Sequence, residues 1–127
     1  TYTVAGIAAI SLAVAGILIM NVMLVAVSQR VSEIGLMKAL GAPQGQVLRI
    51  FLVEAVMLAA SGALIGLLVA AVGIVALRQL FPAFPLAAPV WAPLAAVAVA
   101  VIAGLVFGVL PARRAARLDP VKALGGR

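Results

Sequence analysis

The stretch VAGIAAISLAVAGILIMNVMLVAV, residues 4–27, carries no charged side chain. Its only polar side chains are those of Ser11 and Asn21. A helix that crosses the hydrocarbon core of a bilayer needs about 20 mostly apolar residues, because each residue rises about 1.5 Å and the core is about 30 Å thick. The stretch therefore predicts a membrane-spanning helix over about residues 4–28.

Two later stretches have the same character, and we expect further spans over about residues 46–78 and 90–111. Of the 127 residues, 67% are hydrophobic and 9% are charged, whereas soluble domains carry about 25% charged residues. The predicted fold class is an all-α integral membrane domain. It has three transmembrane helices, a short amphipathic cytoplasmic helix and a short basic carboxyl-terminal helix.

Side chains that carry catalysis or bind metals are scarce. The sequence contains neither cysteine nor histidine, and its only acids are Glu33, Glu54 and Asp119. Acid–base catalysis and metal binding need several convergent polar groups. The phosphate-binding motif Gly-x-x-x-x-Gly-Lys-Ser/Thr does not occur either. We therefore expect no enzyme activity, no metal site and no cofactor in this chain.

Basic residues set the expected orientation, because they concentrate on the cytoplasmic side of inserted helices. Of the nine basic residues, only Arg78 lies between the second and third spans. The other eight flank the opposite ends of the spans: Arg30, Lys38, Arg49, Arg113, Arg114, Arg117, Lys122 and Arg127. We predict that Thr1 lies outside and that the basic tail, residues 112–127, is cytoplasmic. An odd number of spans with an external start also predicts a fragment that lacks an upstream span.

Residues 30–41 predict a short amphipathic helix between the first two spans. Val31, Ile34 and Met37 recur at helical spacing, and Gly41 is a stop signal. The charged side chains of the segment are Arg30, Glu33 and Lys38. The pattern leaves two interpretations open, an interfacial connector between two spans and a docking helix for a partner.

Glu54 is the one acid near the predicted membrane interior. A carboxylate there is costly and usually faces a partner, a cavity or water. We favour an interfacial carboxylate that reaches cytoplasmic water over an ion or proton relay, because no second buried ionisable group accompanies it.

Two small-xxx-small motifs lie in the second and third spans, at Gly62 and Gly66 and at Gly104 and Gly108. Small residues at this spacing let helix backbones approach closely in lipid. They predict tight packing of both spans without naming the surface on which each span packs.

The basic tail begins with Arg113, Arg114 and Arg117. Beside a transmembrane helix, such a cluster fits the positive-inside pattern better than dedicated binding of anionic lipid headgroups or nucleic acid. No aromatic side chain accompanies it for base stacking, so we expect no nucleic-acid partner. Asp119 followed by Pro120 predicts the start of a last short helix.

Three stretches together carry a resemblance to a known family: RVSEIGLMKALGA at residues 30–42, Glu54-Ala55, and PARRAARLDPVKAL at residues 111–124. In this order and spacing they resemble the carboxyl-terminal membrane domain of the MacB/FtsX-like ABC transporter permeases. The resemblance extends over nearly the whole chain.

The resemblance implies a permease subunit with one amino-terminal span, a large extracytoplasmic domain and three further spans, of which this chain would hold the last three. It also implies a homo- or heterodimer with a second permease subunit in the bacterial inner membrane, served by a cytoplasmic ABC ATPase. In that family the ATPase binds the helix that corresponds to residues 30–41. The contacts expected here are Arg30, Val31, Glu33, Ile34, Met37 and Lys38.

ATP hydrolysis by that partner is implied to move the extracytoplasmic domain, for efflux, lipoprotein extraction or control of cell-wall enzymes. The residues alone leave open an alternative, a small structural or interaction protein of three spans without a transport role. A channel or secondary transporter is disfavoured, because a polar pathway through the membrane needs more polar side chains than the single carboxylate found here.

Overall fold

The computed structural model describes residues 1–125, and in that part of the chain all regular secondary structure is helical. In chain order the helices are α1 (Tyr2–Gln29), α2 (Val31–Ala39), α3 (Gln44–Leu80), α4 (Trp91–Ala116) and α5 (Pro120–Leu124). Helices α1, α3 and α4 are long and apolar enough to cross a membrane. The predicted all-α class with three candidate spans is confirmed. Gly126 and Arg127 of the predicted basic tail lie outside the described residues.

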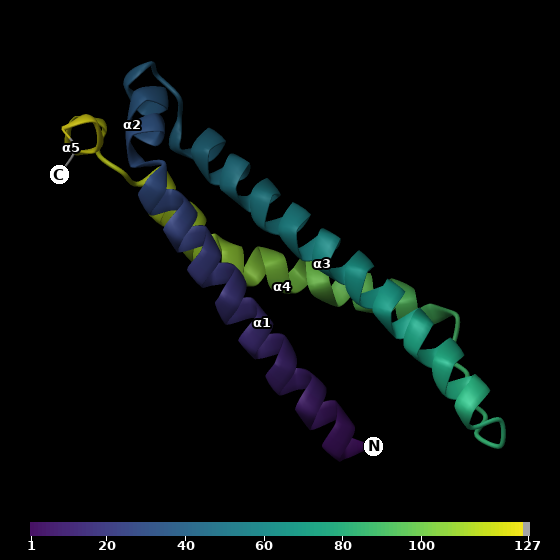
Figure 1. The fold of residues 1–127 in the computed structure, drawn as a ribbon. Helices are drawn as coiled ribbons and strands as arrows, with labels where there is room; N and C mark the ends of the chain where they lie inside the picture. Colours follow the sequence, from purple (N-terminus) through teal and green to yellow (C-terminus); the bar gives the residue numbers. More distant parts are fainter. Residues whose placement is uncertain (126–127) are drawn as a thin grey trace.

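Helix α2 is set off from both neighbouring spans (Figure 1). Arg30 interrupts the helical path after α1, with φ −109° and ψ 16°. At the other end the Gly41 amide donates to the Lys38 carbonyl, and the next amide, of Ala42, donates to the Met37 carbonyl. This pair of bonds is a Schellman motif, which needs a left-handed residue, and Gly41 supplies it with φ 99°. The stop signal predicted at Gly41 is confirmed.

Helix α4 continues to Ala116, beyond the span end expected at residue 111. Pro111 lies inside the helix, where it removes one backbone hydrogen bond. The helix nevertheless persists, because Pro111 and Ala112 are both buried against the rest of the bundle. Arg113 and Arg114 therefore stand on the last turns of α4, so the first part of the predicted basic tail is helical.

Single polar contacts fix the connections that follow α3 and α4. Arg78 Nε donates to the Leu86 carbonyl at 2.6 Å, across the proline-rich turn that joins α3 to α4. The Asp119 carboxylate accepts from the Val121 amide at 3.0 Å and caps α5, as the sequence predicts.

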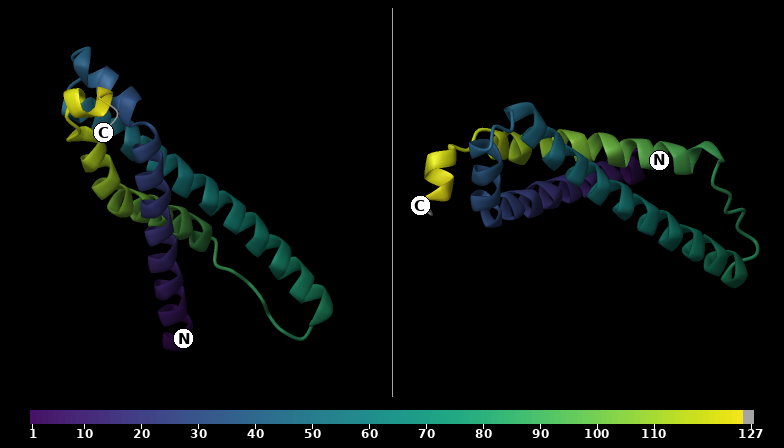
Figure 2. Two further views of the ribbon diagram at one scale, coloured as in Figure 1. Left: turned by 60° about the vertical axis from the view of Figure 1, so that its left-hand side comes forward. Right: turned by 90° about the horizontal axis from the view of Figure 1, so that it is seen from above.

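Helix α4 packs on both α1 and α3, and most extensively on α3. Helices α2 and α5 lie beside each other at one end of the bundle, which we call the α2 end (Figure 1). The long helices converge there. They separate toward the opposite end, so that the start of α1 stands apart from the end of α3 (Figures 1 and 2).

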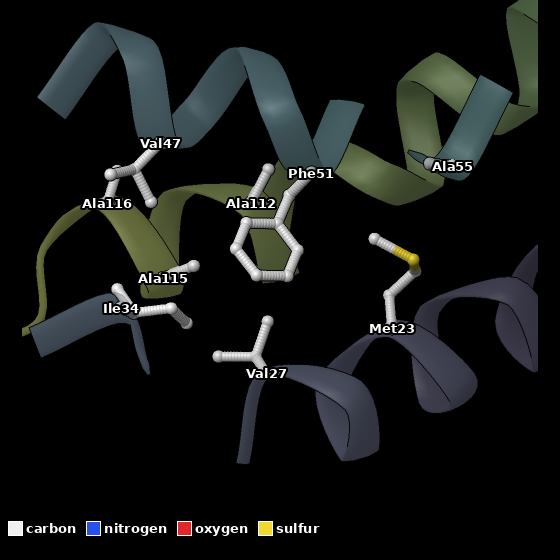
Figure 3. Close-up of a cluster of buried hydrophobic side chains, with 9 residues drawn as sticks. All are labelled: Met23, Val27, Ile34, Val47, Phe51, Ala55, Ala112, Ala115 and Ala116. Atoms are coloured by element: carbon white, nitrogen blue, oxygen red, sulfur yellow. The ribbon is translucent and has the colours of Figure 1, made fainter. Parts of the chain in front are cut away.

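The buried core occupies the α2 end and draws on four helices. It contains Met23, Val27, Ile34, Val47, Phe51, Ala55, Ala112, Ala115 and Ala116. The Phe51 ring lies between Ala112 of α4 and the α1 side chains Met23 and Val27 (Figure 3). The alanines of α4 let the larger side chains of the other helices approach its backbone.

The opposite end of the bundle buries little within the single chain. Among the described residues, α3 has none buried beyond Ala59, and its large apolar side chains from Leu64 to Leu80 are mostly exposed. In a bilayer, lipid tails and neighbouring protein segments cover such surfaces.

Candidate functional site

A set of side-chain contacts that we call the α2 junction joins α2 and the corner before it to the long helices, whereas the backbone of α2 packs mainly beside α5. The members of the α2 junction are Arg30, Glu33, Ile34, Lys38 and Glu54. The apolar contact is Ile34, which is only 1% exposed. Ile34 lies in one core with Val27 of α1, Val47 of α3 and Ala115 of α4 (Figure 3). Val31, three residues earlier, is half-buried.

Lys38 ties α2 to the end of α4. Its Nζ donates to the carbonyl oxygens of Ala116 and Leu118, each at 2.5 Å. The last carbonyls of a helix have no partner within the helix and carry partial negative charge, so an ammonium group is well suited to cap them. Lys38 thus joins α2, the end of α4 and the connection to α5.

Arg30 ties the corner between α1 and α2 to α3. Its Nη1 donates to Glu54 Oε2 at 3.2 Å, and its Nε lies 3.6 Å from Glu33 Oε2. Exposed ion pairs contribute little stability, and the Glu54 side chain is 41% exposed, so this pair links α3 to the corner at a small gain in stability. Sequence reasoning did not find this partner of Glu54, because 24 positions separate the two residues.

The outward face of α2 is not the one that the sequence suggested. Ile34 and Met37 were expected to contact a partner, but Ile34 is buried and Met37 packs against the core of the chain itself. In the single chain this apolar stripe packs on the core of the bundle, and contact of Ile34 and Met37 with a partner stays a prediction. Leu36 and Leu40 are exposed instead, at 52% and 81%. Helical spacing places exposed Glu33 on the same side.

Gly104 and Gly108 lie where α4 meets α3. A Cβ on Gly104 would come 2.7 Å from the Ala59 Cβ, and one on Gly108 would come 2.6 Å from the Ala55 Cβ. A larger residue at either position would force the two backbones apart, so this motif sets how closely α3 and α4 approach.

The other small-residue motif behaves differently. A Cβ on Gly62 or Gly66 would meet nothing within 4 Å, so tight packing of these glycines within the single chain is not observed. Gly16 does pack tightly, since a Cβ there would overlap the Phe107 ring of α4. Sequence reasoning missed Gly16 because it belongs to no pair of small residues spaced four apart.

The predicted basic cluster is exposed at the end of α4. Within residues 1–125, no hydrogen bond or ion pair uses the side chains of Arg113, Arg114 or Arg117. The described residues also bring no group of three metal-ligating side chains together. The α2 junction attaches α2 to its neighbours through one buried apolar side chain and a few polar contacts.

Comparison with known proteins identifies a family and several export proteins. The family described as FtsX-like permease C-terminal matches residues 5–120. The pyoverdine export ATP-binding/permease protein PvdT of Pseudomonas fluorescens is 52% identical over 120 residues, which are 93% of this chain and 18% of that protein. The macrolide export ATP-binding/permease protein MacB of Rhodopirellula baltica is 46% identical over 118 residues, or 93% of this chain and 17% of the relative. MacB of Shewanella oneidensis is 44% identical over 124 residues, or 98% and 19%. The chain thus spans less than a fifth of the length of these curated relatives.

Proposed function

Because the chain belongs to the FtsX-like permease C-terminal family, we propose that it is the membrane domain of a MacB/FtsX-type ABC transporter permease that serves export. Its proposed task is to pass the movement produced by ATP hydrolysis to an extracytoplasmic part of the protein. The names of the relatives join ATP-binding and permease parts in one protein. We therefore place the ATPase in another part of the same polypeptide or in a separate subunit, and assign no ATPase activity to these residues.

The attachment of α2 to all three spans carries this proposal. Ile34 lies in the core shared with α1, α3 and α4, Lys38 holds the end of α4, and Arg30 reaches α3. Packed protein interiors have low compressibility. A displacement of α2 is therefore transmitted to the helices that it contacts as a rigid-body movement.

We propose that the α2 end is cytoplasmic, in a bacterial inner membrane, and that the ATPase docks on the outward face of α2. This face presents Leu36, Leu40 and Glu33, and a helix seated in a groove of a partner uses such a mixture of apolar and charged contacts. Helix α5 lies beside α2 and adds Val121 and Leu124, exposed at 80% and 51%. The proposed docking surface therefore extends over both helices.

Leu36→Asp in the full-length protein tests the docking surface. Burying a leucine at an interface contributes about 1.5–3 kcal/mol, so its replacement by a carboxylate should weaken ATPase docking at least about tenfold. Docking is measured by cysteine cross-linking between α2 and the ATPase, together with the rate of hydrolysis. Leu80→Asp is the matched control, since Leu80 is 72% exposed at the opposite end of the bundle. Normal docking of the Leu36 variant, or an equal loss in the Leu80 variant, would contradict the proposal.

Cysteine accessibility tests the orientation. Ser32 on α2 and Ala83 in the turn after α3 are both exposed, so Ser32→Cys and Ala83→Cys give two reactive positions at opposite ends. In intact cells a membrane-impermeant maleimide should label position 83 and spare position 32. Labelling of position 32 from outside would reverse the proposed topology.

We further propose that the permease acts with a second permease subunit. The support is the exposed apolar surface that remains on α1, including Ile7, Ile10 and Val14, although lipid can cover part of it. Cysteines placed singly along α1 in the full-length protein should form disulfide-linked dimers in membranes at helical periodicity. Absence of any cross-link along α1 would remove this helix from the dimer contact.

A further inference from the structure

Two pockets adjoin each other where α3 and α4 meet at the α2 end. The first, of about 360 Å³, is lined by Gln44, Gly45, Leu48, Arg113, Ala116 and Arg117. The second, of about 300 Å³, continues from Gly45 and Leu48 along α3 and is lined by Arg49 and otherwise by apolar side chains, including Leu105 of α4. Because the pockets share Gly45 and Leu48, they form one surface with a basic end and an apolar end.

The arginines at the basic end lack a counter-charge among the acidic side chains of the chain. Two of the three acids in the sequence pair with Arg30, and the third caps α5. Within residues 1–125, no hydrogen bond or ion pair uses the side chains of Arg49, Arg113 or Arg117. Among residues 1–125, no acidic side chain is left to neutralise these arginines, so the described part of the chain leaves them free to bind an anion.

The apolar end can hold part of an acyl chain. The second pocket follows α3 from Gly45 to Met57, and its wholly apolar part on α3 lies from Leu52 to Met57, after Arg49. Five residues at about 1.5 Å each give about 7.5 Å, which is half of the roughly 15 Å that one leaflet contributes to the hydrocarbon core. The first several carbons of an acyl chain whose headgroup lies at the basic end can therefore lie along this pocket.

We propose that this surface binds one anionic phospholipid from the leaflet at the α2 end, which is the cytoplasmic leaflet in the proposed orientation. The phosphate contacts Arg113 and Arg117, and one acyl chain lies along Leu52, Val56 and Leu105. Arginine is suited to bidentate contacts with phosphate, and basic pockets between transmembrane helices bind anionic headgroups. This site is separate from ATPase docking and goes beyond the proposed function.

Basic residues are generally enriched on the cytoplasmic side of a membrane, and Arg114 allows this general effect to be distinguished from a specific lipid site. Arg114 stands on the same turn of α4 and is exposed, but it lines neither pocket. A purely topological signal would make Arg113, Arg114 and Arg117 interchangeable. A phospholipid site requires Arg113 and Arg117 specifically.

The test uses the full-length permease in neutral detergent, with bound lipid counted by native mass spectrometry and stability followed by thermal unfolding. Phosphatidylglycerol, phosphatidylethanolamine and inorganic phosphate are added in separate titrations. The paired variant Arg113→Gln/Arg117→Gln is compared with Arg114→Gln/Lys122→Gln, which removes the same charge outside both pockets. Neither pair includes a residue of the buried core.

We expect phosphatidylglycerol to bind and raise the Tm of the wild type and of the control pair, with at least about tenfold weaker binding in the Arg113/Arg117 variant. Leu105→Trp, which fills the apolar end, should also weaken lipid binding. Equal losses in both arginine pairs, or none in either, would overturn the proposal. Full stabilisation by inorganic phosphate would show an anion site without a lipid chain. Displacement of the lipid by docked ATPase would show a protein contact.

Discussion

Lys38→Met should separate docking of the ATPase from transmission of its movement. Methionine keeps most of the length and the apolar stem of lysine, but it cannot donate to the carbonyls of Ala116 and Leu118. Hydrogen bonds to a charged group contribute about 1.5–3 kcal/mol each. Lys38 is only partly buried, so we expect the attachment of α2 to α4 to weaken by about 2–4 kcal/mol in total.

The outward face of α2 does not include Lys38, so the ATPase should still dock on this variant. Transport in reconstituted vesicles, expressed as substrate exported per ATP hydrolysed, should fall at least about tenfold, since each 1.4 kcal/mol changes an equilibrium about tenfold. Arg114→Met, on the last turn of α4, also removes one positive charge and is the control, because Arg114 is exposed and no hydrogen bond or ion pair among residues 1–125 uses its side chain. Lys38→Arg should restore part of the ratio because it can still donate. Normal coupling in Lys38→Met would refute the idea that α2 acts through the end of α4.

Three further changes probe the packing and the corners of α2. Gly108→Ala should lower the free energy of unfolding by about 1–3 kcal/mol, because the added methyl group overpacks against α3. Gly66→Ala places its methyl group in open space and should leave the Tm unchanged or raise it. Equal effects of the two variants would contradict the close approach of α4 to α3 at Gly108. Arg30→Glu should reduce export, and the exchange Arg30→Glu/Glu54→Arg should recover part of it if their contact orients α3. Gly41→Ala should destabilise the turn after α2 by about 1–2 kcal/mol, because φ 99° is strained for alanine, and faster proteolysis of the turn would report this.

The long apolar stretches were enough to predict three candidate spans, because each helix is long and apolar enough to cross a bilayer. Local signals also located the turn at Gly41 and the cap at Asp119, since both depend on neighbours within a few residues. The end of α4 could not be read in this way. Pro111 is normally a stop signal, and only its burial against the other helices explains why α4 continues.

The site was harder to predict for a related reason. An amphipathic pattern shows that Ile34 and Met37 lie on a covered face, but it does not show whether the cover is a partner or the same chain. The Arg30–Glu54 and Lys38–Ala116 contacts join residues 24 and 78 positions apart, for which one sequence offers no pattern. Gly62 and Gly108 have equivalent motifs, yet only Gly108 meets another helix within the chain.

Because the long helices converge at the α2 end, α3 is packed in the core over its first part and is mostly exposed over its longer second part. A tilt of the packed part therefore displaces the far end of α3. Its buried residues stop at Ala59, and no proline interrupts the 37-residue helix up to Leu80. The free arm beyond Ala59 is about 30 Å long at 1.5 Å per residue, so a tilt of about 5° at the held end moves its tip by about 2.6 Å. With Ala59 as the pivot, the other arm of α3, from Val47 to Ala59, is about 18 Å long, so the same tilt corresponds to a displacement of about 1.6 Å where Val47 shares a core with Ile34. The tip of α3 therefore moves farther than the end beside Ile34, by a factor of less than about two.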